Sequence, residues 1–460
     1  MLVLGVINCL KLCYFRPIIF STLSVDKNCL KNSAFSITPR LSNIFNTPYY
    51  NHTYQYTKKT FSLFFDRQGR RERKNMKFTV SKSTFINKLT PAMGTVSTKD
   101  TITAIEGVLI ETLDDCKIRI STYDMNKGNR SLFLPTSIER EGKFIINAAR
   151  LYQTVRVLPD DEITIDINDK LGCTISSGKA SFSMFAMKGE DFPNLPDLVS
   201  DKGFEISSEK LRMIIGKVSH SIAEQDNRPM LCGAFFKITE GLLEVISCDS
   251  YTLSRCSVKC DINSISQSGE LGLSFIIPGH ALGELSKHLA EGNEENETFY
   301  VSRKHAIIKK GDAIFFTRTI DSEYIDYERI IPRDNDVSVI VDRDNILSAL
   351  ERANIIAEEK VKGSGKSYVK LSLEDQSLTI TSSSVNGKVY DELDCVHEGG
   401  DLEIGFNCRY LINSIRVAEG ENIKITLKSS TQAITIEPTE ADDEYKYFYM
   451  ILPVRMNEQK

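Results

Sequence analysis

Apolar residues recur along this chain in one compound pattern. A short apolar run typical of a strand is followed by a few polar residues and then by apolar residues at helical spacing. The first copy occupies residues 78–89, and further copies begin at 144, 204, 275, 339 and 404, at intervals of 60 to 71 residues. Six copies at a near-constant interval predict a chain built from repeated strand–helix units.

Alternating strands follow each unit. After the odd-numbered units, apolar pairs separated by turn residues predict hairpins at 107–112 with 117–121, 233–238 with 243–246, and 368–373 with 378–380. After the even-numbered units, strands are predicted at 162–166, 298–302 and 422–426. The clearest helices are predicted at 148–157 and 208–219.

Two units make a larger repeat that occurs three times. Polar stretches with proline at 196–200 and 332–336 separate the copies. We therefore predict an α+β fold with three tandem domains at 76–200, 201–336 and 337–460, called domains 1, 2 and 3 below. Each is expected to pack two helices on antiparallel sheets.

Composition narrows the class of protein. With 41% hydrophobic and 26% charged residues, the chain is typical of soluble globular proteins, and no apolar run is long enough to span a membrane. The eleven cysteines form no CxxC pair and show no zinc-site spacing, which favours reduced thiols over disulfides or metal. We expect no metal and no cofactor.

The first 75 residues differ from the rest. They contain 12 basic and 3 acidic residues, so residues 76–460 have a net charge of −14. Without a basic start, this segment does not fit a secretory signal, whereas its acid-poor composition fits a transit peptide. The run Gly69-Arg70-Arg71-Glu72 also matches a translated bacterial ribosome-binding site. We favour a mis-assigned start with Met76 as the true first residue, and expect 1–75 to be disordered; the intact mass of the native protein tests this.

Basic residues recur on all six predicted helices. One such helix is an ordinary solvated surface, but six in an acidic body favour positive charge gathered on one surface for nucleic acid. The candidate DNA contacts on these helices are Arg150, Arg156, Lys210, Lys217, His280, Arg352 and Arg409, and the family resemblance carried by the motifs below implies Lys99 and Gln225 as two more.

Motifs in all three repeats resemble one family. They are Met-Lys-Phe-Thr-Val at 76–80, Asp-Phe-Pro-Asn-Leu at 191–195, Gln-Asp-Asn-Arg at 225–228, Asp-Tyr-Glu-Arg-Ile-Ile-Pro at 326–332, Glu-Ile-Gly-Phe-Asn at 403–407 and Leu-Pro-Val-Arg-Met at 452–456. In this order they resemble the bacterial DNA polymerase III beta subunit, the sliding clamp family.

The resemblance implies a non-catalytic processivity factor. Two chains would close head to tail into a ring of twelve inward-facing helices around double-stranded DNA, without sequence specificity. The implied partners are the DNA polymerase III alpha subunit, the clamp loader, other polymerases and repair proteins. The implied location is the bacterial cytoplasm, near the nucleoid, or an organelle if residues 1–75 are a transit peptide.

The resemblance also implies a groove for partner peptides between domains 2 and 3. Its residues would be Leu231, Cys248, Ser250, Tyr251, Thr252, Leu253, Ile325, Arg329, Ile330, Met450, Leu452, Pro453, Val454 and Arg455. On the apolar pattern alone, 450–456 fits a core strand equally well.

Three stretches depart from the family pattern. Many members carry Thr-Asp-Gly/Ser-His-Arg-Leu where this chain has Cys-Asp-Ser-Tyr-Thr-Leu at 248–253, which removes a basic side chain from the rim of the groove. The run 324–327 lacks the usual proline, and the loop at 97–100 keeps only Lys99 as a cation. We expect partner preference to differ accordingly.

Two motifs resemble known sites but do not fit them. Gly-Ser-Gly-Lys-Ser at 363–367 lacks the first glycine of a phosphate-binding loop and follows a helix. His280 and His288 share a helical face without further ligands, so a metal site is not expected.

Two other functions compete with the clamp interpretation. They are a peptide-binding repeat scaffold that does not encircle DNA and an enzyme hidden in the strand–loop segments.

Overall fold

The computed structural model describes residues 75–97, 102–159, 162–198, 203–239, 241–259, 272–289, 296–302, 304–357, 368–384, 387–440 and 445–456. Every element below belongs to Arg73–Lys460, the second of the two units of the chain. The predicted extension up to residue 74, Lys99 and the stretch 363–367 lie outside the described residues.

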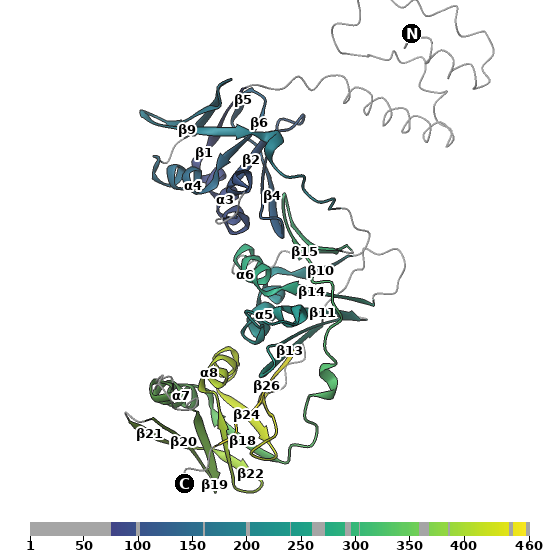
Figure 1. Cartoon of the computed structure of the whole chain (residues 1–460), viewed down its shortest axis with the longest axis vertical. Helices are drawn as coiled ribbons and strands as arrows, with labels where there is room; N and C mark the ends of the chain where they lie inside the picture. Colours follow the sequence, from purple (N-terminus) through teal and green to yellow (C-terminus); the bar gives the residue numbers. More distant parts are fainter. Residues whose placement is uncertain are drawn as a thin grey trace, which may run out of the picture. The chain divides into compact units, whose positions relative to one another are not determined.

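The second unit repeats one motif six times: a strand, a helix and a three-stranded meander (Figure 1). The leading strands are β1 (Met76–Ser81), β6 (Lys143–Asn147), β10 (Gly203–Ser207), β14 (Leu273–Pro278), β18 (Val337–Asp342) and β23 (Leu402–Phe406). The helices are α3 (Lys82–Ala92), α4 (Ala148–Val157), α5 (Ser208–Val218), α6 (Gly279–His288), α7 (Arg343–Ala357) and α8 (Cys408–Val417). The prediction of six strand–helix units is confirmed, and α4 has the predicted bounds.

The meanders supply most of the sheet. They are β2 (Gly107–Thr112), β3 (Ile118–Tyr123) and β4 (Lys127–Phe133); β7 (Glu162–Ile167), β8 (Gly172–Ser177) and β9 (Ala180–Lys188); β11 (Gly233–Thr239), β12 (Leu242–Cys248) and β13 (Thr252–Lys259); β15 (Asn296–Val301), β16 (His305–Lys310) and β17 (Ala313–Arg318); β19 (Val369–Glu374), β20 (Ser377–Ser383) and β21 (Lys388–Asp394); and β24 (Asn422–Leu427), β25 (Ile434–Pro438) and β26 (Tyr445–Ile451). β5 (Ser137–Arg140) and β22 (Val396–Glu398) are short additional strands.

A polar cap starts most of the helices directly after the preceding strand. Ser81, Asn147, Ser207 and Asn407 each accept a hydrogen bond from a backbone N–H in the first turn of α3, α4, α5 and α8. Asp342 does the same for α7. Such caps satisfy backbone donors that otherwise have no partner, which explains why strand turns to helix without a loop.

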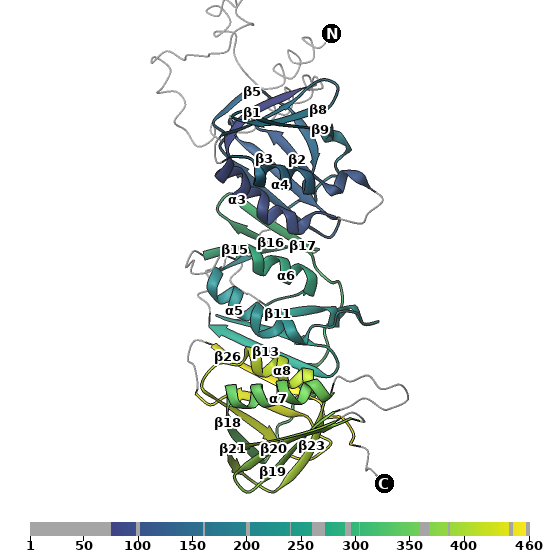
Figure 2. The same ribbon diagram turned by 90° about the vertical axis from the view of Figure 1, so that its left-hand side faces the viewer.

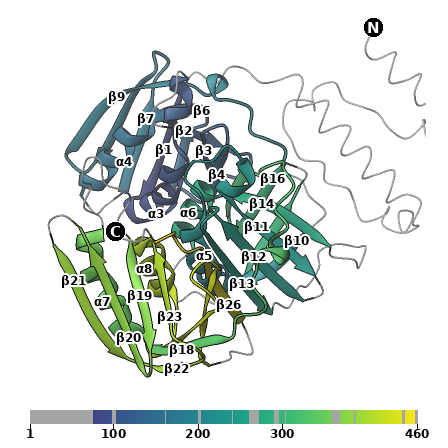
Figure 3. The ribbon, with the colours of Figure 1, turned by 60° about the horizontal axis from the view of Figure 1, so that its bottom comes forward.

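Antiparallel pairing joins the meanders into three sheets of 13, 9 and 4 strands. Two ladders cross domain boundaries: β4 pairs with β17 between domains 1 and 2, and β13 pairs with β26 between domains 2 and 3. The four-stranded sheet of domain 3 ends at β21 (Figure 3). Backbone hydrogen bonds therefore hold the domains together at both internal joints.

The core lies between the sheets and the helices. Domain 1 has its own apolar cluster around Phe78, Phe85 and Leu151, and a larger cluster runs through domains 2 and 3. Smaller clusters lie at the two joints, where Phe192 and Tyr327 from the connecting segments pack over the sheets. All six helices face the viewer in Figure 2.

Candidate nucleic-acid interface and peptide groove

Exposed cations lie on the helix side of the unit. Arg150 and Arg156 on α4 and Arg409 on α8 are exposed, while Lys210 on α5 is half-buried. The guanidinium carbon of Arg156 lies 5.6 Å from the centroid of the Tyr152 ring, which supports an extended side chain. Gln225 is exposed in the segment after α5.

Carboxylates neutralise part of this basic surface. Arg352 on α7 donates to Asp391 of β21, with an Nε–Oδ2 distance of 2.7 Å. Arg416 at the end of α8 lies 2.9 Å from Glu351 of α7. A paired guanidinium attracts phosphate less than a free one, because its charge is already compensated.

Lys217 requires a correction. We expected it to contact DNA, but it is only 4% exposed. Its Nζ lies 2.6 Å from Glu419 Oε1, donates to the Val417 carbonyl at 2.6 Å, and lies 4.3 Å from the centroid of the Tyr447 ring. Burial lowers the pKa of Lys217, and Glu419 acts in the opposite direction. Lys217 thus joins domain 2 to domain 3 and does not face solvent.

His280 is at the surface but adds little positive charge. Partial burial lowers the pKa of its imidazole, and the nearby Lys127 lowers it further. His280 is therefore mostly neutral at pH 7, and its role would be a hydrogen bond instead of an ionic contact.

Sequence-distant segments build an apolar cluster at the joint between domains 2 and 3, where the sequence predicts the peptide groove. Its buried residues include Leu231, Cys248, Leu253 and Met450, and Ile325 packs against them. These five were all predicted from the sequence, and the structure brings them together. Leu253 pairs with Met450 across the β13–β26 ladder, and both are buried, so β26 is a core strand; its part in a peptide groove stays a prediction.

Exposed residues surround this cluster. Ile330 and Leu452 are 45% and 39% exposed, Pro453 and Val454 are half-buried, and Arg455 is exposed. The backbone N–H of Val454 donates to the Gly405 carbonyl at 2.8 Å, which fixes the end of the chain against domain 3. Arg329 is paired with Asp326 at 2.8 Å.

A tight turn around Ser250 borders this apolar cluster and is called the rim below. Ser250 has a φ of +80°, and its hydroxyl accepts a hydrogen bond from Arg228. Thr252 is buried, whereas Tyr251 is 55% exposed and stacks on Tyr410 of α8 with ring centroids 5.7 Å apart.

Tyr410 was not among the predicted groove residues, nor were Tyr324, Tyr327, Ala433 and Phe448. Tyr327 belongs to the family motif at 326–332, and Tyr324 belongs to the run 324–327 that departs from the family pattern, so their position in the chain offered a signal. Tyr410 offered none, because only the packing of domain 3 on domain 2 brings it to the rim.

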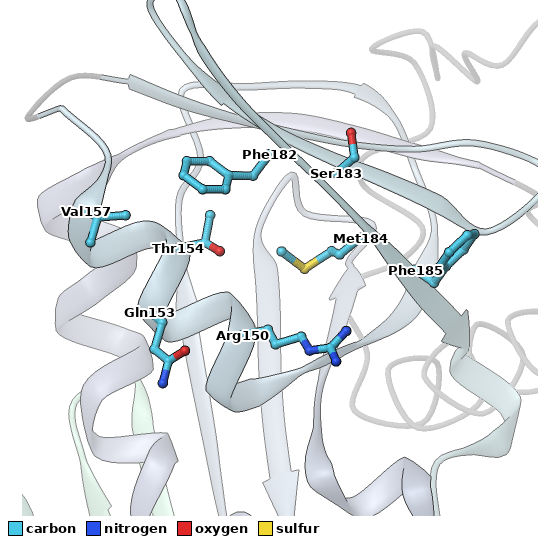
Figure 4. A pocket seen from close by; sticks show the side chains of 8 residues that line it. All are labelled: Arg150, Gln153, Thr154, Val157, Phe182, Ser183, Met184 and Phe185. Carbon is cyan, nitrogen blue, oxygen red and sulfur yellow. The ribbon is translucent and has the colours of Figure 1, made fainter.

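A second hollow lies between α4 and β9 (Figure 4). Phe182 and Met184 of β9 point towards Thr154 and Val157 of α4. Phe185 is 83% exposed and Val157 is 72% exposed. Exposed apolar groups gathered in one place mark an interaction surface.

Within the described ranges, no cluster of three or more His, Cys, Asp or Glu side chains is arranged to hold a metal ion. None of the helices in that same part of the chain is long and apolar enough to cross a membrane.

Tandem domains of paired helices on antiparallel sheets, joined by strand ladders, define the DNA clamp class of proteins. The family models for the N-terminal, central and C-terminal domains of the DNA polymerase III beta subunit match residues 76–196, 205–326 and 328–455. The chain belongs to the DNA polymerase III beta subunit family.

Individual relatives agree. The beta sliding clamp of Bacillus subtilis (strain 168) is 26% identical over 392 residues, covering 83% of this chain and all of the relative. The solved sliding clamp from Bacillus subtilis superposes with a TM-score of 0.76 at 26% identity, again covering 83% of this chain and all of that one. A Pseudomonas aeruginosa sliding clamp solved with bound griselimycin also gives a TM-score of 0.76, at 25% identity and the same coverage.

Proposed function

We propose that this chain is a DNA sliding clamp, a non-catalytic subunit that encircles duplex DNA and tethers the replicative polymerase. The observation that carries the proposal is the strand pairing at the joints between domains. The proposed domains keep the boundaries 76–200, 201–336 and 337–460. The proposed location is the bacterial cytoplasm, near the nucleoid.

The two internal joints follow one rule. In each, the last strand of the first meander of one domain pairs with the last strand of the second meander of the next domain: β4 with β17, and β13 with β26. By the same rule, β21 of domain 3 and β9 of domain 1 are the two strands without a partner from another domain among the described residues. β21 pairs only with β20, and residues 180–185 of β9 pair only with β8, among the described residues.

A second copy of the chain can satisfy both open strands. If β21 of one copy pairs with β9 of the next, the contact is head to tail, and a closed ring leaves neither strand unpaired. Apolar side chains flank both strands: Val157, Phe182 and Phe185 at β9, and Ile355 and Tyr390 at β21, the last two 71% and 66% exposed. Their burial would favour a homodimer.

Contacts to DNA in such a ring need only be weak. Encirclement itself prevents dissociation, so phosphate contacts without sequence preference allow sliding. The proposed contacts are Arg150, Arg156, Lys210, Gln225, Arg352 and Arg409, with Lys99 from the loop after α3. Lys217 is not among the proposed contacts because it is buried. His280 remains among them as a neutral hydrogen-bonding group.

Partners would dock in the groove between domains 2 and 3. An apolar cluster with flanking polar groups fits a short peptide carrying alternating apolar side chains. The proposed partners are the DNA polymerase III alpha subunit, the clamp loader, other polymerases and repair proteins. Tethering would act by raising the effective concentration of the polymerase at the primer end.

Retention on DNA circles tests the encirclement. We expect the full chain to stay on a closed circular plasmid through gel filtration at high salt, and to leave after one restriction cut, because only a topological link depends on DNA ends. Equal retention on circular and linear DNA would contradict the proposal. A monomer in light scattering that also fails to stay on circles would favour the repeat scaffold.

A further inference from the structure

The rim of the groove holds an aromatic pair on a fixed backbone. Asp249 Oδ1 accepts hydrogen bonds from the backbone N–H of Tyr251 at 2.9 Å and of Thr252 at 2.6 Å. The Tyr251 carbonyl accepts one from Leu452 at 2.8 Å. The Tyr251 backbone is thus held from domain 2 and from domain 3, which orients its ring before any ligand arrives.

The two rings form a continuous platform. Tyr251 and Tyr410 lie nearly parallel, with an interplanar angle of 18° and centroids 5.7 Å apart. Tyr251 is 55% exposed, and it lies next to Thr252 and Leu253, which join the apolar cluster. An aromatic face left open next to a binding groove offers both apolar area and a negative ring quadrupole.

The charged group that acts on this platform is the Asp249 carboxylate. Arg228 is held by Asp226 through Nε and Nη2, each 3.0 Å from a carboxylate oxygen, so its charge is compensated. Among the described residues, the hydrogen-bond donors to the Asp249 carboxylate are backbone N–H groups, which bring no positive charge. Burial raises the pKa of the Tyr410 hydroxyl, and the Asp249 carboxylate raises it further, which puts negative charge close to the platform.

We propose that the Tyr251–Tyr410 platform selects partner peptides that carry a lysine or arginine next to their apolar anchors. This inference rests on the docking role proposed above and specifies the chemistry of the docked peptide. The apolar side chains fill the cluster around Leu253 and Met450, while the cation lies over the Tyr251 ring, near Asp249. A carboxylate at the same position meets the ring face and Asp249, and both repel it.

A matched peptide series tests the inference with the full chain. The probes are fluorescent pentapeptides Xaa-Leu-Ser-Leu-Xaa with arginine, glutamine or glutamate at both Xaa positions, which makes the result independent of peptide direction. We expect the arginine peptide to bind about two- to fivefold more tightly than the glutamine peptide, the range of one exposed cation–π contact, and the glutamate peptide to bind most weakly.

Variants assign the effect to the platform. Tyr251→Ala should abolish the preference for arginine over glutamine, whereas Tyr251→Phe, which keeps the ring, should retain it. Unchanged retention on circular DNA shows that each variant folds. Equal affinity for the three peptides, tightest binding of the glutamate peptide, or full preference in Tyr251→Ala would each overturn the inference.

The peptide and DNA experiments distinguish failure of the docking role from failure of encirclement. If none of the peptides binds while the chain stays on DNA circles, the groove is not the docking site, and both the docking role and this inference fail while the clamp stands. If the chain leaves circular and linear DNA alike but still ranks the peptides, the platform stands and encirclement fails.

Discussion

His220 lies inside the joint between domains 2 and 3. Its Nε2 is 3.1 Å from Ser254 Oγ and 3.2 Å from Ser414 Oγ, and its ring packs edge-on against Tyr449. Burial, followed by the charge of Lys217, lowers the pKa of His220 to about 4. The imidazole is therefore neutral in the folded protein at pH 7.

This shift makes stability depend on pH. Between the unfolded pKa of about 6.5 and the folded value, the unfolded state binds more protons, so stability falls as pH drops through this window. From pH 7 to pH 4.5 we expect His220 to account for a loss of about 2 kcal/mol. Urea unfolding at both pH values should show a smaller loss for His220→Phe; an equal loss would contradict the assignment.

Lys217 and Arg409 offer a contrast between a buried and an exposed cation. Arg409→Gln should reduce the slope of log affinity for duplex DNA against log salt by about 0.9, because one phosphate contact is lost. Lys217→Met should leave that slope unchanged and lower the free energy of unfolding by about 1 kcal/mol. Fluorescence anisotropy over a salt series, with urea unfolding alongside, measures both.

A changed salt slope in Lys217→Met would mean that this side chain reaches DNA after all. The sequence could not separate these two residues, because both occupy basic positions of an amphipathic helix. The burial of Lys217 depends on Glu419 and Tyr447, which come from domain 3. Which cation is covered is therefore decided by tertiary packing, and local periodicity does not contain it.

The strands and helices were largely predictable. Apolar spacing and the caps Ser81, Asn147 and Ser207 define where strand turns to helix, and these signals are local. The pairing of β4 with β17 and of β13 with β26 was not predictable from the pattern, because strand partners are set by contacts far apart in the sequence. The open strands β9 and β21 emerged only with the sheet order.

A charge placed beside either open strand should separate the proposed dimer. Phe182→Asp next to the hollow of α4 and β9 would bury an unpaired carboxylate at the subunit contact, at a cost of several kcal/mol. Light scattering should then give the mass of one chain, 51.8 kDa, instead of two.

Leu242→Asp provides the matched control. Leu242 is also apolar and 37% exposed, but it lies at the β11–β12 hairpin, away from both open strands. This variant should remain a dimer. Dissociation of both variants, or of neither, would contradict the assignment of β9 to the interface.

Assembly should also affect the stability of the whole molecule. Because the proposed dimer would cover β9 and β21 only in the folded state, mass action predicts a melting temperature that rises with protein concentration. Differential scanning fluorimetry from about 0.1 to 100 µM should show this rise for the native chain, and Phe182→Asp should melt at a constant temperature. A concentration-independent native chain would argue against a dimer.

The domain organisation and the family were the most predictable properties of the molecule. Six copies of one pattern, with motifs in their order, predicted the three domains and the family. The chemistry of the rim was the least predictable part, since the stacking of Tyr251 on Tyr410 joins residues of two domains. Family motifs predict where the groove lies, and the preference that we propose for it rests on residues that depart from those motifs.

The backbone ladders between domains have a consequence for evolution. A hydrogen bond between main-chain groups does not depend on side-chain identity, so substitutions along β13 or β26 can accumulate without separating the domains. The chain superposes on the Bacillus subtilis clamp with a TM-score of 0.76 although only 26% of the residues are the same. Side chains at a joint can thus change while the strand pairing that holds the domains together stays the same.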